Sequence, residues 1–510
     1  MIIIFHKNNK VTQVYDYSLN QELTIKGNMI QDVLVLVASK YKSSFIGWCH
    51  LNLKGSLNLK KWNTILKHKL LLVSFETSTN YYITSDISYV EDTPFVNVNK
   101  SDSYPTWLMS SDVGGIHTDV LLKFKHLLKY KLTFELFLNT IAKVGMQQGL
   151  LCYSNPFLLN EGYSTISKKS APTSEIIQFI KSNYKLRWIF LYVFNQFIYN
   201  TKFLGVSLFL SLFKKKIRTK VLFKDIAIAN DKTTISPTVD VLIPTLGREQ
   251  YLKDVLLDLA KQTLLPKKVI IIEQIPTKGA ASKLDFLNDN WPFKIDHTLI
   301  YQLGACNARN IGLNKVTADW VFFADDDIRF KNSFFEGAFK YIAKYQVNAV
   351  NLSCLQKNET EIYNYIFQLS TFGSGTSIVN SKPLKNIKFN MAYEFGFGED
   401  SDFGMQLRNL GTDILYVPFV TMLHLKAPIG GFRKKIEREW ELETIQPKPS
   451  PTVMVYKLTH ATKEQLQSYK TTLFLKFYKK QSIRNPIRYY KQMNKAWNKS
   501  LYWANYLIKK

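Results

Sequence analysis

The chain has few cysteines and no spacing that would pair them. Four occur in 510 residues, and neither a disulfide framework nor a cluster of zinc-binding thiolates is indicated. They are Cys49, Cys152, Cys306 and Cys354. The chain also lacks the charged leader and long apolar core of a signal peptide, because the apolar run at its start is short and typical of a β-strand. We therefore expect a folded protein of a reducing compartment.

Acidic residues are almost missing from two long segments. Residues 176–224 contain ten Lys and Arg and no Asp or Glu, and residues 451–510 contain thirteen Lys and Arg and one acid, Glu464. Together these segments carry +22 of the total net charge of +27. Because the basic charge is concentrated in this way, we expect a surface or arm that meets a polyanion.

The first basic segment also contains two uncharged runs, residues 188–201 and 203–213, separated by Lys202. Each is shorter than the roughly 18–20 residues that span a bilayer. At the membrane centre Lys202 would cost about 2.5–3.5 kcal/mol. We therefore expect helices that lie on a membrane surface or bridge two domains, in preference to a transmembrane helix.

The second basic segment mixes its Lys and Arg with aromatic side chains such as Tyr489, Trp497 and Trp503. Basic helices with aromatic residues suit an anionic membrane surface, and the same mixture suits single-stranded nucleic acid. A third interpretation is that Lys and Arg stems cover a helical core without any partner. We predict a basic amphipathic helical tail over residues 436–510.

The remaining sequence predicts two α/β regions. Residues 1–165 alternate short apolar runs with polar turns and include two helical patterns, which predicts an N-terminal α/β domain. Residues 166–236 are predicted to form a basic, aromatic helical linker. Over residues 237–435, apolar strands alternate with amphipathic helices, and this alternation predicts a mainly parallel sheet covered on both faces.

Polar side chains follow three predicted strands of the second region. Pro244 and Thr245 end one strand, Glu273 follows the next, and three carboxylates, 325–327, follow the buried strand 320–324. Ligands of such sheets bind beyond the carboxyl ends of the strands. Three adjacent carboxylates beside apolar residues repel one another, and a Mg²⁺ or Mn²⁺ ion relieves this while leaving room for phosphate. The simpler interpretation is an acidic turn after a strand.

Four short segments of this region occur in a specific order. They are residues 241–248 (VLIPTLGR), 306–312 (CNARNIG), 322–327 (FFADDD) and 398–411 (GEDSDFGMQLRNLG). They resemble, in turn, the opening strand, the Asn-Ala-Arg-Asn-x-Gly helix, the DXD segment and the Gly-Glu-Asp-x-Asp segment of the family 2 inverting glycosyltransferases, which have the GT-A fold. The resemblance extends over about residues 237–430 and is typical of bacterial enzymes of cell-surface polysaccharide synthesis.

This resemblance implies transfer of a sugar from a nucleotide diphosphate donor to an acceptor hydroxyl, with inversion. It assigns Asp325 and Asp327 to a Mn²⁺ or Mg²⁺ ion that bridges the diphosphate, with His424 as a further ligand. Asp400 holds the position of the family's catalytic base, and Glu399 is the alternative. Without the resemblance, the two acids are equally typical of the first turn of a helix, where the helix dipole favours them.

The resemblance also implies a set of donor-binding residues, namely Pro244, Thr245, Arg248, Glu273, Arg309 and Asp325. Glu273 is expected to hold the base or ribose, although the family's usual residue there is Asp. Arg309 is expected to contact base or phosphate, or alternatively to form a structural salt bridge with the carboxylates. The glycine-containing loop 426–433 is expected to close over the diphosphate, or to remain a solvated loop.

Residues 1–165 contain a faint repeat of this pattern. Gly149 precedes Pro156 by seven residues, as Gly411 precedes Pro418, and a Phe-led acidic helix precedes both. We predict that this region is a degenerate GT-A-like domain without a DXD segment, which binds acceptor or stabilises the enzyme. A different α/β domain is the alternative.

The expected partners are a nucleotide sugar, a carbohydrate or lipid-linked carbohydrate acceptor and an anionic membrane surface, with no role for nucleic acid. This predicts a cytoplasmic protein, peripheral at the inner face of the cytoplasmic membrane. The competing interpretation is a non-catalytic sugar- or nucleic-acid-binding protein on a GT-A scaffold. The intact Asp325, Asp327 and Asp400 disfavour it.

Overall fold

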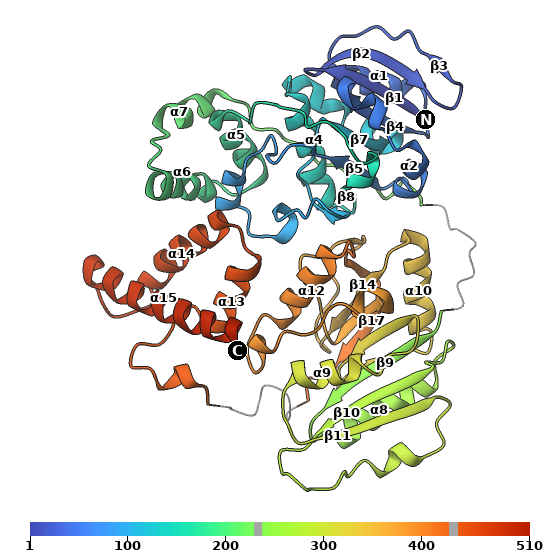
Figure 1. The fold of residues 1–510 in the computed structure, drawn as a ribbon, viewed down its shortest axis with the longest axis vertical. Helices are drawn as coiled ribbons and strands as arrows, with labels where there is room; N and C mark the ends of the chain where they lie inside the picture. Colours follow the sequence, from blue (N-terminus) through green and yellow to red (C-terminus); the bar gives the residue numbers. More distant parts are fainter. Residues whose placement is uncertain (229–236, 428–436) are drawn as a thin grey trace. The chain divides into compact units, whose positions relative to one another are not determined.

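The computed structural model describes residues 1–228, 237–427 and 437–510. By their contacts these residues fall into two compact units. Unit 1 comprises Met1–Ala229 and Ala461–Phe477, and unit 2 comprises Asn230–His460 and Tyr478–Lys510. Each unit contains one large β-sheet with helices packed against it (Figure 1).

The described part of unit 1 holds an eight-stranded sheet in the order β3-β2-β1-β4-β7-β5-β8-β6. Its central strands are rich in Ile, Val, Leu and Phe, which pack well on a pleated surface. β1, β4, β5 and β7 are buried along almost their whole length. The strands are β1 (Ile2–Lys7), β2 (Lys10–Asp16), β3 (Gln21–Glu22), β4 (Phe45–His50), β5 (Leu71–Phe75), β6 (Tyr104–Pro105), β7 (Val113–His117) and β8 (Leu151–Ser154).

The helices of unit 1 cover this sheet and extend beyond it. α4 lies deepest, because nearly all of its residues are buried, and Thr133 Oγ1 caps it by accepting from the Leu136 N–H at 3.3 Å. The helices are α1 (Ile30–Lys40), α2 (Leu59–Ile65), α3 (Thr118–Lys123), α4 (Phe134–Met146), α5 (Thr173–Asn183), α6 (Arg187–Asn200), α7 (Gly205–Phe213) and α14 (Lys463–Tyr478), with short 3₁₀ helices η1 (Leu51–Ser56), η2 (Ser85–Tyr89), η3 (Pro94–Val96), η4 (Lys125–Tyr130) and η5 (Pro156–Leu158).

The sheet of unit 2 runs in the order β11-β10-β9-β12-β16-β14-β17-β13, and β15 also pairs with β17. β12 is completely buried, and its phenylalanines pack edge to face against those of α10 and α12. The strands are β9 (Val239–Thr245), β10 (Lys268–Gln274), β11 (Lys294–Ile300), β12 (Trp320–Ala324), β13 (Ile328–Phe330), β14 (Ala349–Leu355), β15 (Phe367–Gln368), β16 (Thr376–Asn380) and β17 (Leu415–His424).

The helices of unit 2 include two from the basic C-terminal segment, α13 and α15, which pack against each other. α13 also meets the segment before α12, where the Phe397 N–H donates to Thr452 Oγ1 at 3.2 Å. The helices are α8 (Glu249–Ala260), α9 (Ala305–Leu313), α10 (Phe334–Tyr345), α11 (Ser381–Leu384), α12 (Glu399–Asn409), α13 (Pro451–His460) and α15 (Pro486–Lys509), with 3₁₀ helices η6 (Asp285–Asn288), η7 (Met391–Tyr393) and η9 (Glu439–Leu442).

The two sheets share an arrangement of six strands. The neighbours are β1, β4, β7, β5, β8 and β6 in unit 1, and β9, β12, β16, β14, β17 and β15 in unit 2. The five pairings are parallel, antiparallel, antiparallel, parallel and antiparallel in both sheets. Corresponding strands also follow one another along the chain in the same order. Beyond them the sheets differ, because unit 1 continues with antiparallel β2 and β3, and unit 2 with parallel β10 and β11.

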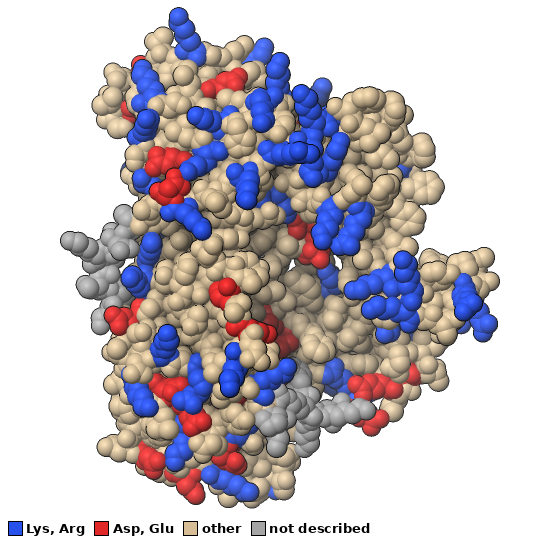
Figure 2. Space-filling view, turned by 180° about the vertical axis from the view of Figure 1, so that it is seen from behind, with Lys and Arg blue, Asp and Glu red and all other residues tan. Residues whose placement is uncertain are grey.

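The predicted α/β class, the separate N-terminal sheet and the C-terminal helices are confirmed. The boundaries at residues 165, 236 and 435 stay a prediction. By contacts, the described part of the expected linker groups with unit 1, and the expected tail is divided between the units. In the described ranges, no helix combines the length and apolar character needed to cross a membrane. Lys and Arg side chains are spread widely over the face drawn in Figure 2.

Candidate active site

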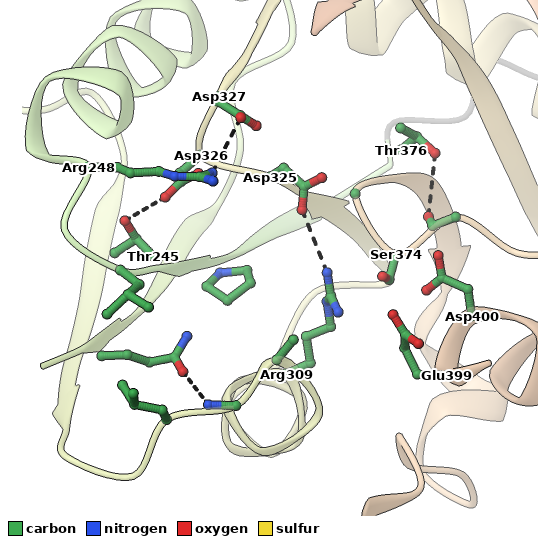
Figure 3. Close-up of a pocket in the computed structure, with 18 of the residues that line it drawn as sticks. Thr245, Arg248, Arg309, Asp325, Asp326, Asp327, Ser374, Thr376, Glu399 and Asp400 are labelled. Carbon is green, nitrogen blue, oxygen red and sulfur yellow. Dashed lines mark hydrogen bonds and ion pairs between the residues drawn. The ribbon is translucent and has the colours of Figure 1, made fainter. Parts of the chain in front are cut away.

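A cavity of about 540 Å³ lies at the carboxyl ends of β9 and β12 in unit 2 (Figure 3). Its walls come from these strand ends, the start of α9, the turn before β16 and the start of α12. It therefore gathers segments that are far apart in the sequence. The predicted site residues that line it are Pro244, Thr245, Arg248, Arg309, Asp325, Asp327, Glu399, Asp400 and His424.

Asp326, the middle carboxylate, is held by side chains that follow β9. Thr245 Oγ1 donates to its Oδ2 at 2.7 Å, and Arg248 Nη1 donates to its Oδ1 at 2.5 Å. Burial raises the pKa of Asp326 to about 6, although Arg248 and Thr245 oppose this shift. Asp326 and Arg248 therefore tie the end of β12 to the turn after β9, which is a structural task for both residues.

Asp325 faces the cavity beside Arg309, whose Nη2 lies 3.6 Å from Asp325 Oδ1. Burial raises the pKa of Asp325, while Arg309 opposes the shift. Gly375 makes room for this carboxylate, because a Cβ there would lie 2.1 Å from Asp325 Oδ2. The salt bridge considered for Arg309 is thus present. Its Nε is buried without a hydrogen-bond partner among the described residues, so the guanidinium keeps a donor for a ligand.

Asp327 is anchored by the backbone beyond β17. The Ala427 N–H donates to its Oδ2 at 2.9 Å, and Arg248 Nη1 lies 3.3 Å from the same oxygen. His424 Nε2 lies 3.4 Å from Asp327 Oδ1, because β13 pairs Ile328 with His424. A carboxylate oxygen and an imidazole nitrogen therefore face each other at the cavity wall.

This pair fits a metal that is shared with a ligand. Within the described ranges, no group of three or more His, Cys, Asp or Glu side chains is spaced to hold a metal by itself. Asp327 Oδ1 and His424 Nε2 are close enough for one cation to touch both, and both donor types suit Mn²⁺. Cations of this kind commonly take one or two carboxylates and complete their shell with phosphate oxygens and water.

The opposite wall is the start of α12, which carries Glu399 and Asp400. Gly398 precedes the helix at φ 120°, a conformation that favours glycine. Burial, reinforced by Asp400, raises the pKa of Glu399. Asp400 Oδ1 is buried and has no hydrogen-bond partner among the described residues, a costly state that a bound ligand would relieve. Both carboxylates face Asp325 across the cavity in Figure 3.

Two further acids near the site lie outside the cavity lining. Asp402 lies in the first turn of α12, and its Oδ1 is 2.7 Å from His460 Nε2 on α13. Glu273 is absent from the cavity lining, and its Oε2 lies 2.8 Å from His297 Nε2 on β11. Its contact with base or ribose stays a prediction. Most of the loop 426–433 lies outside the described residues.

Two cavity residues had no recognisable signal in the sequence. Glu394 accepts from the Cys306 and Asn307 N–H groups at 3.1 and 2.8 Å, at the start of α9. Gly304 allows this approach, because a Cβ there would lie 2.3 Å from the Glu394 carboxyl carbon. Gln274 accepts from the Gly304 N–H at 2.6 Å. Both side chains act across long sequence separations, so local pattern does not reveal them.

Residues 240–398 match the protein-family model described as Glycosyl transferase family 2. The match starts on β9 and ends immediately before α12, so it includes the carboxylates 325–327. The chain therefore contains a GT-A-like domain of glycosyl transferase family 2, which confirms the resemblance drawn from the four sequence segments.

Individual relatives are distant. Over 131 residues the chain is 24% identical to Glycosyltransferase GlyA of Streptococcus pneumoniae serotype 4. This aligned region is 25% of this chain and 18% of GlyA. Staphylococcus aureus TarS 1–349 in complex with UDP-GlcNAc is 17% identical with a TM-score of 0.37, covering 52% of this chain and 81% of TarS 1–349. Mannosyltransferase PcManGT from Pyrobaculum calidifontis, in complex with GDP-Man and Mn²⁺, is 14% identical with a TM-score of 0.33. This match covers 54% of this chain and 89% of PcManGT.

Proposed function

We propose that this chain is an inverting, metal-dependent glycosyltransferase that moves a sugar from a nucleotide diphosphate donor to an acceptor hydroxyl. The observation that carries the proposal is Asp400, which lines the same cavity as Asp325 and Asp327 and has a carboxylate oxygen without a hydrogen-bond partner among the described residues. Displacement at a sugar carbon needs a proton acceptor on one side and charge stabilisation for the leaving diphosphate on the other. The family 2 match supports the same reaction.

On the donor side, the chain's residues position the diphosphate. Asp327 and His424 would hold a Mn²⁺ or Mg²⁺ ion, with Asp325 beside them, and the ion supplies positive charge to the leaving group. Arg309 offers base or phosphate its Nε, which has no hydrogen-bond partner among the described residues. Arg248 already binds Asp326 and Asp327, so we assign it to positioning these acids.

On the acceptor side, Asp400 takes the hydroxyl proton as the acceptor oxygen attacks the anomeric carbon. The diphosphate leaves from the opposite face, and the configuration at that carbon inverts. Glu399, the preceding residue of the same helix, is the alternative base. Asparagine has nearly the same shape as aspartate but carries no negative charge. Asp400→Asn would therefore keep the shape of the cavity wall and remove the proton acceptor.

The acceptor has a candidate entrance in a second cavity of about 460 Å³, which shares Glu394 and Phe395 with the first. Its lining includes Trp440 and Trp503, whose ring centroids are 6.1 Å apart. Aromatic faces suit the apolar faces of sugar rings. Phe395 stands between the cavities at φ 59°, a strained conformation often found at functional sites. Trp503→Ala is expected to raise KM for the acceptor and to leave donor hydrolysis unchanged.

The direct test measures nucleoside diphosphate release from a panel of nucleotide sugars with Mn²⁺. A thermal-shift screen against the same panel selects the donor, because a ligand of the folded state raises stability. Asp327→Ala is expected to abolish metal-dependent release. Asp319→Asn, at the opposite end of β12 where Asp319 bonds Thr238, is the matched control and should retain it. Equal turnover in wild type and Asp327→Ala would refute the enzymatic proposal.

For unit 1, we propose a degenerate copy of the same scaffold. The shared order and sense of six strands support this proposal. Beside the six shared strands, unit 2 has the parallel strands β10 and β11, whereas unit 1 has the antiparallel strands β2 and β3. The last residue pair of the β4–β7 ladder is Cys49 with Val113, and the last pair of the corresponding β12–β16 ladder is Ala324 with Thr376. Cys49 thus corresponds to Ala324. His50 therefore takes the position of Asp325.

The equivalent edge of unit 1 is closed by an internal cation. Lys168 Nζ pairs with Glu76 and lies 3.0 Å from Asp112 Oδ1; both acids are buried, and the Lys168 side chain is 13% exposed. The ammonium group of Lys168 thus offsets the negative charge of Glu76 and Asp112, as a metal ion would do for acids that line a cavity. We propose that unit 1 binds no nucleotide sugar and serves acceptor binding or stability.

The lipid-linked or polysaccharide nature of the acceptor and a cytoplasmic, membrane-peripheral location also remain proposals. They are supported by the concentration of basic charge in two segments. A non-catalytic binder on the same scaffold accounts less well for Asp325, Asp327 and Asp400 on the walls of one cavity, because binding alone needs no proton acceptor opposite acids that suit a metal.

A further inference from the structure

Helix α6 of unit 1 has its polar and apolar faces reversed. Its buried face carries Ile189, Tyr192, Asn195 and Gln196, and both amide side chains are at most 1% exposed. The opposite face presents large apolar side chains to solvent, namely Phe190, Phe194, Phe197 and Ile198, which are 44–62% exposed. A helix on the surface of a water-soluble core shows the opposite distribution.

Asn195 of α6 is hydrogen-bonded to α14, while Gln196 bonds Tyr192 and Asn200 within α6. Asn195 Nδ2 donates to Ser468 Oγ at 3.3 Å, and Asn195 Oδ1 accepts from Thr471 Oγ1 at 2.7 Å. The Tyr199 hydroxyl donates to the Gln467 carbonyl at 3.2 Å. These hydrogen bonds fix the rotation of α6 about its axis, so its phenylalanines cannot turn inward without breaking a buried polar network.

The next segment continues the exposed apolar surface. α5, α6 and α7 form one group in Figure 1, and α7 packs on α5. Apolar side chains of α7 and the turn before it are strongly exposed, namely Phe203, Val206, Phe209, Leu210, Leu212 and Phe213, at 50–84%. Contiguous exposure of this kind is rare on monomeric proteins and marks a contact with a membrane or another protein.

The charge around this surface indicates which partner it contacts, a membrane or another protein. Residues 176–224 contain ten Lys and Arg and no acid, and Lys185, Arg187, Lys215 and Lys216 are exposed beside the apolar side chains. Protein interfaces are depleted in Lys. Basic residues that border exposed Phe and Leu match an anionic lipid surface, where the apolar groups enter the acyl boundary and the charges meet phosphate.

We propose that α6 and α7 form a bilayer-contact element, which inserts its exposed phenylalanines into the interface of an anionic membrane without crossing it. Neither helix is long enough to cross. The element belongs to unit 1 and holds no residue of the candidate active site, so the proposal is independent of catalysis. It also assigns a task to the first basic segment, which the reaction does not use.

Flotation of the full chain with vesicles tests this proposal. Binding is expected to vesicles of phosphatidylglycerol and phosphatidylcholine, with at least tenfold less to phosphatidylcholine alone and a decrease at high salt. The triple variant Phe194→Ser, Phe197→Ser, Phe209→Ser is expected to lose at least tenfold in vesicle binding. The control Ile362→Ser, Phe419→Ser removes two exposed apolar side chains of unit 2 that lie outside both basic segments and should bind as wild type does.

A second measurement is independent of the triple variant. A Phe209→Cys chain carrying an environment-sensitive dye should give a blue-shifted emission with anionic vesicles, and the labelled wild type provides the background. No flotation of wild type, or equal flotation of wild type and triple variant, would overturn the proposal. If light scattering finds a dimer that the triple variant loses, without vesicle binding, the surface joins two copies and the membrane proposal is wrong.

Discussion

The two units carry acidic groups at the same edge of sheets with the same strand order, and neutralise them differently. In unit 1, Lys168 fills the space between Glu76 and Asp112. In unit 2, Arg248 binds Asp326 and one oxygen of Asp327, which leaves the remaining carboxylate oxygens on the wall of a cavity. The comparison teaches that a shared strand order can end in different edges: the acids of unit 1 pair with a lysine, and those of unit 2 line a cavity.

The largest expected effect concerns the base. Asp400→Asn should lower kcat by about 10²–10⁴-fold, because it removes the proposed proton acceptor and preserves the shape of the side chain. Glu135→Gln changes the first turn of α4, the helix that precedes β8 as α12 precedes β17, and should leave kcat unchanged. Steady-state transfer assays with the donor found by thermal shift compare the two variants. A loss of kcat in Glu135→Gln would break the proposed contrast between the units.

The next effect concerns the internal cation of unit 1. Lys168→Met leaves Glu76 and Asp112 buried without their cation, which is expected to lower the free energy of unfolding by about 3–5 kcal/mol. Lys315→Met removes the more exposed pair between Lys315 and Asp296 at 2.8 Å, and should cost about 0–1 kcal/mol. Urea unfolding of the full chain measures both. Equal destabilisation would mean that the Lys168 pair behaves like a surface pair.

Much of unit 2 could be predicted from the sequence because its signals are local. A buried strand followed by carboxylates 325–327, and the helix start at Glu399, each lie within one continuous segment. The pairing of Lys168 with Glu76, and of His460 with Asp402, joins segments that only the fold brings together. The reversed faces of α6 were equally hidden, because apolar side chains occur on all sides of the helix and only its contacts reveal which side is exposed.

A ligand-binding experiment sharpens the same contrast. Nucleotide sugar with Mn²⁺ should slow hydrogen exchange at residues 245–248, 325–327 and 373–376 of unit 2. The corresponding edge of unit 1, residues 50–52 and 110–113, should not change. At a ligand concentration of 100 times Kd, the stabilisation is about 2.7 kcal/mol. Removal of the metal by EDTA should reverse much of the protection, since the diphosphate then lacks its cation. Protection at both edges would show that unit 1 also binds the donor.

The smallest effect is a dependence on pH in unit 1. Burial raises the pKa of Glu76 from 4.5 to about 7, although Lys168 opposes the shift. Between these values the folded state binds more protons than the unfolded chain, so the free energy of unfolding falls as pH rises. Glu76→Gln removes this titration and should flatten the decrease between about pH 5 and 7. Native-state hydrogen exchange of β5 and β7, corrected for the intrinsic exchange rate, measures the slope.

A matched measurement on the second acid paired with Lys168, Asp112 of the same unit, completes this test. Asp112 has the opposite behaviour, because Lys168 and Thr77 lower its pKa despite its burial; its stabilising contribution is lost as pH falls below about 4. Asp112→Asn should therefore change the acid limb of the curve and leave the slope above pH 5 in place. If the free energy of unfolding measured at β5 has the same pH slope in Glu76→Gln and wild type, the pKa of Glu76 is not raised in the folded state. Glu76 is then charged when buried, and the effect of Lys168 on its pKa offsets the effect of burial.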